Sequence, residues 1–207
     1  MSIERNGPCP CGKSRKFKQC CGRSADATSD LYAAVHEIGH ALVLPKRARP
    51  HVSFQNPCSQ CAGEEGTQIA RAHTGFEAGF ERTGVDELLY SLAGGAAEVA
   101  CGLSPLMQNT EFGSYPASMS NDFENLQNEL NGEMWDVVKS LLRDCFNALV
   151  NYFREIIDQI WAAARDFLDK RVLTHHELGL VRIERNTIVR RFGVILDLPD
   201  PPESAIE

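Results

Sequence analysis

The residues with the clearest chemical potential are His36, Glu37 and His40, which lie in the stretch HEIGH. Side chains four positions apart lie on one face of a helix, so the two imidazoles can bind a single metal ion. A glutamate next to the first histidine can polarise a water molecule on that metal. The types and spacing of these residues therefore predict a zinc site suited to hydrolysis.

A helix that begins near residue 31 and ends at Leu44, before Pro45, must position these side chains. At about 100° per residue, both histidines lie roughly opposite an apolar stripe on this helix. The stripe consists of Leu31, Val35, Ile38 and Leu42. The alternative is a surface helix that contains the motif by chance. The face with the histidines is itself rather apolar, which disfavours that alternative.

A catalytic zinc ion needs a third protein ligand and an open position for water. Glu98 lies in the stretch LAGGAAEVACG, whose small residues allow this helix to pack closely against the first one. A carboxylate there could be the third ligand or could support a ligand from behind. Asp122 lies in the first turn of a later helix, where capping is its simpler role. Chemistry alone leaves both Glu98 and Asp122 open as the third ligand.

Four cysteines near the N-terminus form a second candidate metal site. Cys9 and Cys11 are followed, after eight residues, by Cys20 and Cys21, and four thiolates complete a tetrahedral structural zinc site. The alternative, two disulfides, requires an oxidising compartment, and no apolar signal segment precedes these cysteines. We therefore expect structural zinc and a reducing, cytoplasmic location.

The same stretch also fits the template of a phosphate-binding loop, because GPCPCGKS has four residues between Gly7 and Gly12-Lys13-Ser14. Such a loop follows a buried strand, and the six residues before Gly7 are too few for one. Pro8 and Pro10 also remove two of the amides that would bind phosphate. We therefore predict that the chain does not bind ATP.

Charge is distributed unevenly along the chain. Residues 1–23 carry six basic side chains and one acidic one, a net +5, so the remainder carries −12 of the total of −7. The acidic part argues against general nucleic-acid binding, whereas the basic N-terminal segment could bind RNA or an acidic protein. No apolar run approaches the 18 or so residues that cross a bilayer, so we expect no membrane span.

The remaining pattern predicts a mainly α-helical domain over residues 31–192, with one short β-hairpin. Residues 1–23 form the zinc-binding segment and residues 24–30 a linker. Residues 193–207 are acidic and rich in proline, so we expect a disordered tail.

Within the domain, we expect strands at 51–57 and 66–72, on either side of a turn that contains Cys58 and Cys61. Cys101 and Cys145 lie in apolar helical stretches and should be buried. Helices are expected at 86–102, from about residue 120, across 133–170 with a break, and at 174–192. The last of these begins at a capping box of Thr174 and Glu177, which also explains the neighbouring histidines.

Three segments together resemble the protease domain of the FtsH-type zinc metalloproteases. They are AAVHEIGHALV, LYSLAGGAAEVACG and SMSNDFENL, in this order, and the resemblance covers about residues 30–192. It implies that His36 and His40 bind zinc, that Asp122 is the third ligand and that Glu37 is the general base. It also implies that Glu98 lies close to the zinc ion and that one hairpin strand pairs with an extended substrate.

The N-terminal segment, residues 7–23, resembles the SEC-C zinc motif, CxC-x8-CC. We expect the chain to lack both the ATPase module and the membrane spans that precede the FtsH-type protease domain. Together, the two resemblances imply a zinc-dependent, ATP-independent metalloendopeptidase that acts on flexible or partner-delivered proteins. The rival class is a zinc-binding adaptor with little or no activity that binds protein or RNA. The intact Glu37 favours the enzyme.

The stretch NPCSQCAGEEG is an addition relative to that family's hairpin. Cys58 and Cys61 have the spacing of half a zinc site, and His51, His73 or a second chain could complete it. A pair of free thiols in a turn explains the same two residues equally well. The sequence leaves both possibilities open.

Overall fold

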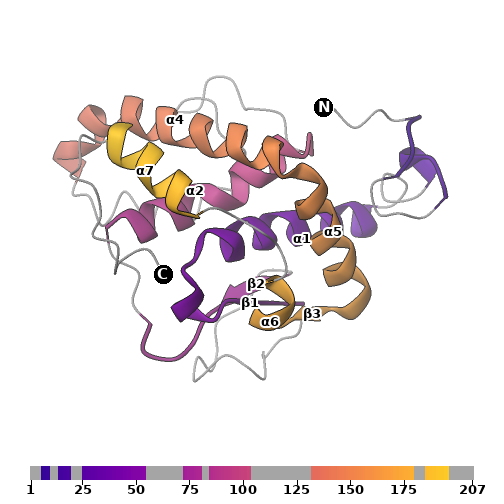
Figure 1. The fold of residues 1–207 in the computed structure, drawn as a ribbon. Helices are drawn as coiled ribbons and strands as arrows, with labels where there is room; N and C mark the ends of the chain where they lie inside the picture. Colours follow the sequence, from indigo (N-terminus) through magenta and orange to yellow (C-terminus); the bar gives the residue numbers. More distant parts are fainter. Residues whose placement is uncertain are drawn as a thin grey trace.

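The computed structural model describes residues 6–9, 14–19, 25–54, 72–80, 84–103, 132–179 and 185–195. The fold is mainly α-helical, as expected, with a small antiparallel sheet. Its elements form layers in the order sheet, α1, α2 and α4, while α5 lies beside α1 and α7 packs against α4 (Figure 1). The helices are α1 (Ala25–Val43), α2 (Val85–Ala100), α4 (Gly132–Glu155), α5 (Ile157–Lys170), α6 (His175–Leu178) and α7 (Arg185–Ile195), with short 3-10 helices η1 (Phe17–Gln19) and η2 (Lys46–Ala48). Among these helices, none is long and apolar enough to cross a membrane.

Helix α1 begins at Ala25, so the residues expected as a linker are helical from position 25 onwards. That prediction was wrong because the alanines of this stretch favour a helix and nothing in it breaks one. The Asp30 carboxylate also accepts a hydrogen bond from the Arg171 guanidinium at 2.9 Å, which ties this first part of α1 to the end of α5. The predicted apolar stripe is confirmed, since all four of its residues are buried: Leu31, Val35, Ile38 and Leu42.

Helix α2 is the central layer, because residues 91–98 are all buried. A helix that is apolar on all sides belongs in the interior, which agrees with the composition of this stretch. Its small residues allow α1 to approach closely. A Cβ on Gly39 would lie 2.6 Å from the Ala93 carbonyl oxygen and 2.8 Å from the Ala97 Cβ. The predicted close packing of these two helices is therefore confirmed.

The sheet has three strands in the order β2-β1-β3: β1 (His51–Ser53), β2 (His73–Gly75) and β3 (Val172–Leu173). In the central strand, Val52 pairs with Thr74 on one side and with Leu173 on the other, both antiparallel. The second strand was expected at 66–72, of which residues 66–71 lie outside the described residues. The strand that pairs with β1 lies at 73–75, and neither a strand at this place nor β3 was expected. These short strands are defined by long-range pairing and by packing on α1, which leave no local pattern.

The long helical region breaks at Ile156, which confirms the expected break and separates α4 from α5. Helix α5 ends at Lys170, and the next residue, Arg171, has a left-handed conformation (φ 67°). Its guanidinium lies 3.8 Å from the centroid of the Phe54 ring, and Phe54 stacks on Phe167. These contacts join the end of β1 to the turn between α5 and β3.

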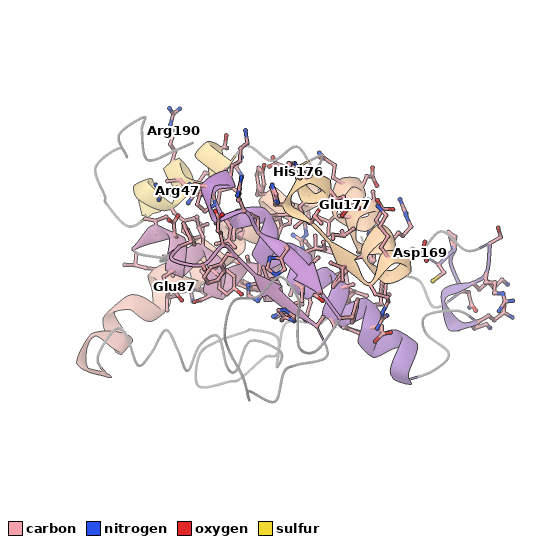
Figure 2. All side chains as sticks on the ribbon, turned by 90° about the horizontal axis from the view of Figure 1, so that it is seen from below. Arg47, Glu87, Asp169, His176, Glu177 and Arg190 are labelled. Atoms are coloured by element: carbon pink, nitrogen blue, oxygen red, sulfur yellow. The ribbon has the colours of Figure 1, made fainter. Side chains whose placement is uncertain are left out.

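The predicted capping box of Thr174 and Glu177 is confirmed, because Glu177 Oε2 accepts from the Thr174 backbone N–H at 2.8 Å. It starts α6, which Figure 2 marks with His176 and Glu177. One helix was expected from 174 to 192, but α6 ends at Leu178 and α7 begins at Arg185. Helix α7 reaches Ile195, so the first three residues of the expected tail are helical.

Cys101 and Cys145 are buried thiols, as expected, and burial raises the pKa of each to about 12. Cys9 is also a buried free thiol. Its backbone N–H donates to the Arg15 carbonyl at 2.9 Å, and Pro8 pairs antiparallel with Lys16, so the chain folds back on itself here. Residues 104–119, the helix expected near residue 120 and most of the expected tail lie outside the described residues.

Candidate metal centre

The imidazoles of His36 and His40 meet at their Nε2 atoms, which lie 2.9 Å apart. Both rings come from α1, and the spacing of four residues places them on one face of it, as expected. His40 is buried, and the His36 side chain is only 13% exposed. The interpretation of this motif as part of a solvated surface helix is therefore wrong.

The other nitrogen of each ring is held by an oxygen from α2. His36 Nδ1 lies 3.0 Å from Glu98 Oε1, and His40 Nδ1 lies 2.8 Å from the carbonyl oxygen of Tyr90. A carbonyl and a carboxylate oxygen accept hydrogen bonds, so the ring proton belongs on Nδ1 in both cases. Each Nε2 then presents a lone pair to the other. Only a cation between them, a proton or a metal ion, relieves that repulsion.

Gly94 of α2 lies directly against this pair of nitrogens. A Cβ at this position would lie 2.5 Å from His36 Nε2 and 2.7 Å from His40 Nε2. Glycine therefore keeps open the place where the two nitrogens converge. Two imidazole nitrogens held in this way suit zinc, which binds histidine at about 2.0–2.1 Å. Nitrogens sharing one tetrahedral zinc ion lie about 3.3 Å apart, close to the observed separation.

Glu37 is buried and faces the sheet, where its carboxylate contacts β2. The Thr74 hydroxyl lies 2.7 Å from Glu37 Oε2 and 2.8 Å from the Glu37 main-chain carbonyl oxygen. The carboxylate predicted from the sequence to be the general base thus follows His36 directly in the chain and contacts strand β2. Nothing in the local sequence around Thr74 points to this contact, because it depends on how the sheet packs on α1.

Glu98 supports His36 from behind, since it binds Nδ1 and so lies on the side of the ring away from the Nε2 pair. This is the usual position of a carboxylate that orients a metal-binding histidine. Of the two interpretations that the sequence left open for Glu98, the geometry favours the supporting one. Asp122, the other candidate for the third ligand, lies outside the described residues.

Two tyrosines next to the histidine pair, Tyr90 and Tyr32, were not predicted from the sequence. The Tyr90 ring stacks on His40, with centroids 4.3 Å apart and an angle of 21° between the planes, while its carbonyl holds the same ring. Tyr90 and Gly94 are four residues apart on α2, a spacing that could have suggested a common face. Tyr32 donates to the Leu103 carbonyl, and burial, followed by the charge of Glu98, raises the pKa of Tyr32.

His51 and His73 lie on the face of the sheet away from Thr74, with ring centroids 6.4 Å apart. Burial, followed by the His73 and His175 imidazoles, lowers the pKa of His51, and burial lowers that of His73. Their suggested partners Cys58 and Cys61 lie outside the described residues, as do Cys11, Cys20 and Cys21. Within the described part of the chain, no group of three or more His, Cys, Asp or Glu residues could hold a metal ion.

Comparison with known proteins gives one short match. Over 25 residues, 12% of this chain, it is 60% identical to the protein translocase subunit SecA of Symbiobacterium thermophilum. The matched stretch spans 3% of that protein's length. The match gives partial support to the SEC-C resemblance and does not bear on the resemblance to FtsH-type proteases. No family model matches the chain.

Proposed function

We propose that this chain is a zinc-dependent, ATP-independent metalloendopeptidase. The observation that carries the proposal is the convergence of the two Nε2 atoms of α1, with each Nδ1 held by an oxygen of α2. Holding the outer nitrogens fixes the rings in the form that can bind a metal, which is what a permanent metal centre requires.

In this proposal, His36 and His40 would hold the zinc ion together with Asp122, the ligand that the family resemblance implies. A zinc ion bound there would supply a Lewis acid that polarises a peptide carbonyl and makes water more acidic. Glu37 accepts the proton of the attacking water and passes it to the leaving amine. Glu98 and the Tyr90 carbonyl hold the histidine rings in orientation.

Strand β2 is the natural place for an extended substrate. The central strand β1 is paired on both sides, whereas β2 pairs with β1 alone among the described residues. An extended peptide can add to such an outer strand through main-chain hydrogen bonds. A peptide lying along β2 would pass the strand that contacts Glu37, since Thr74 lies at the centre of β2. An enzyme that works without ATP in this way would act on flexible segments.

The N-terminal segment would hold a second, structural zinc ion through Cys9, Cys11, Cys20 and Cys21. Its basic charge would bind an acidic protein or RNA partner and so bring substrates to the protease domain in a reducing cytoplasm. The short likeness to SecA supports only the resemblance of this segment to the SEC-C motif.

The experiment compares wild type with Glu37→Gln, measuring zinc per chain and the cleavage of unstructured casein. We expect two zinc ions per chain in both proteins and cleavage by the wild type alone, because the glutamine side chain can still pack but cannot accept a proton. Glu155→Gln, the same change at an exposed position on α4, should behave like the wild type.

If the wild type holds both zinc ions but cleaves neither casein nor any member of a peptide library, the proposed activity is wrong. The alternative class, a zinc-binding adaptor, then describes the chain better. If the wild type binds only one zinc ion and the loss of the N-terminal cysteines removes it, the metal centre itself is absent.

A further inference from the structure

Thr74 occupies the middle of the outer strand β2, and its side chain points towards α1. The strand is held at this position by backbone pairing with Val52 of β1. Side chains alternate along a strand, so the His73 side chain points away from α1. Thr74 itself is only 9% exposed. Its hydroxyl is therefore fixed by the sheet, and not by a mobile surface loop.

This hydroxyl contacts two oxygen atoms of one residue. It lies 2.7 Å from Glu37 Oε2 and 2.8 Å from the Glu37 main-chain oxygen. A hydroxyl has a single hydrogen, so at any moment it donates to one of the two oxygens. The main-chain oxygen lies in the middle of α1, where it also accepts the bond of the next helical turn. Both the backbone and the carboxylate of Glu37 are thus held against the same atom of β2.

We infer that Thr74 is a positioning residue for Glu37, through which the outer strand sets the place of the base carboxylate. The inference rests on the proposed function, and it adds a coupling between the substrate strand and the base. A peptide that pairs with β2 steadies the strand, and the strand steadies the carboxylate through the hydroxyl. The contact lies on Glu37 and not on the histidines, so zinc binding is independent of it.

Four variants test this inference: Thr74→Val, Thr74→Ala, Thr74→Ser and, as a matched control, Thr187→Val on α7. Valine suits a strand and keeps the shape of threonine without its hydroxyl, so the fold should persist. Each protein is assayed for zinc per chain, for the thermal unfolding midpoint, and for kcat and KM on a casein-derived peptide.

We expect Thr74→Val and Thr74→Ala to lower kcat about 10- to 100-fold, the range that follows from losing one hydrogen bond to a charged group. KM should stay within about threefold, and zinc per chain should be unchanged. Thr74→Ser retains the hydroxyl, so its kcat should lie within about threefold of the wild type. Thr187→Val should match the wild type in zinc content, kcat and KM.

A kcat for Thr74→Val equal to that of the wild type overturns the inference, as does a Thr74→Ser variant as slow as Thr74→Val. A rise in KM at constant kcat also overturns it, because that result assigns Thr74 to substrate binding. If Thr74→Val does not fold, Thr74→Ala gives the same comparison with serine. These results leave the proposed function intact, whereas a wild type that cleaves nothing overturns both.

Discussion

Replacing Gly94 with alanine places a methyl group where the two imidazoles meet. The new Cβ would lie 2.5 Å from His36 Nε2 and 2.7 Å from His40 Nε2. An ordinary contact begins near 3.4 Å, so the His36 ring would have to withdraw by about 0.9 Å, the difference between 3.4 and 2.5 Å. The ring cannot do so freely, because Glu98 holds its Nδ1.

That displacement is large for a metal ligand, because metal–ligand distances at a working site vary by only about 0.2 Å. Gly94→Ala should therefore lose at least one histidine as a ligand and lower the affinity for zinc by at least about 100-fold, more than the loss of an outer partner usually costs. The overpacking should also lower the free energy of unfolding by about 1–3 kcal/mol.

The assay is competition for zinc with a chelator of known affinity, together with urea unfolding of the metal-free proteins. Gly179→Ala is the matched control. A Cβ at this position would lie 3.1 Å from the nearest atom, the His175 carbonyl oxygen, and Gly179 is far from Gly94 in the sequence. It should bind zinc like the wild type. If Gly94→Ala binds zinc as tightly as Gly179→Ala, the zinc ion is not held where the two Nε2 atoms converge.

Three further predictions concern other parts of the molecule. Asp122→Asn should lose the zinc ion bound by the histidine pair and keep the N-terminal zinc ion. Glu98→Gln should lower the affinity of the histidine pair for zinc by only about 10- to 100-fold, as zinc titrations can show. If Glu98→Gln loses this zinc ion and Asp122→Asn retains it, the roles of Glu98 and Asp122 are reversed. Burial and neighbouring imidazoles lower the pKa of His51, so the unfolded chain protonates this imidazole more readily than the folded chain does. The free energy of unfolding should therefore decrease as pH falls below about 6.5. Urea titrations at pH 7.5 and 5.5 should show a smaller decrease in His51→Phe than in the wild type. Arg185→Met should lower the free energy of unfolding measured in urea by about 3 kcal/mol, because the arginine side chain is only 10% exposed where it binds the Asp86 carboxylate. A decrease of less than about 1 kcal/mol would show that this ion pair contributes little to stability.

Features that depend on nearby residues could be predicted from the sequence. The apolar stripe of α1 and the capping box at Thr174 both follow from spacing within one or two helical turns. The approach of α2 to α1 was also predictable, because Gly94 and its small neighbours have no other evident use. These patterns are local, so a short stretch of sequence is enough to predict each of them.

Features that depend on long-range contacts could not be predicted. Strand β3 pairs residues that are more than a hundred positions apart in sequence, and its two residues carry no strand pattern of their own. The contact of Thr74 with Glu37 depends on the same packing. The Tyr90 carbonyl is a backbone atom, so no side-chain pattern could indicate its role at His40. The sequence therefore predicts the two nitrogens that converge at the site, and only in part the groups that hold them.

An anomalous difference map, recorded from a crystal at the zinc absorption edge, tests the proposed metal centre most directly. We predict a peak between the Nε2 atoms of His36 and His40, and a second peak among the N-terminal cysteines. A map that shows zinc at the cysteines and no peak between the two histidines would contradict the proposed metal centre.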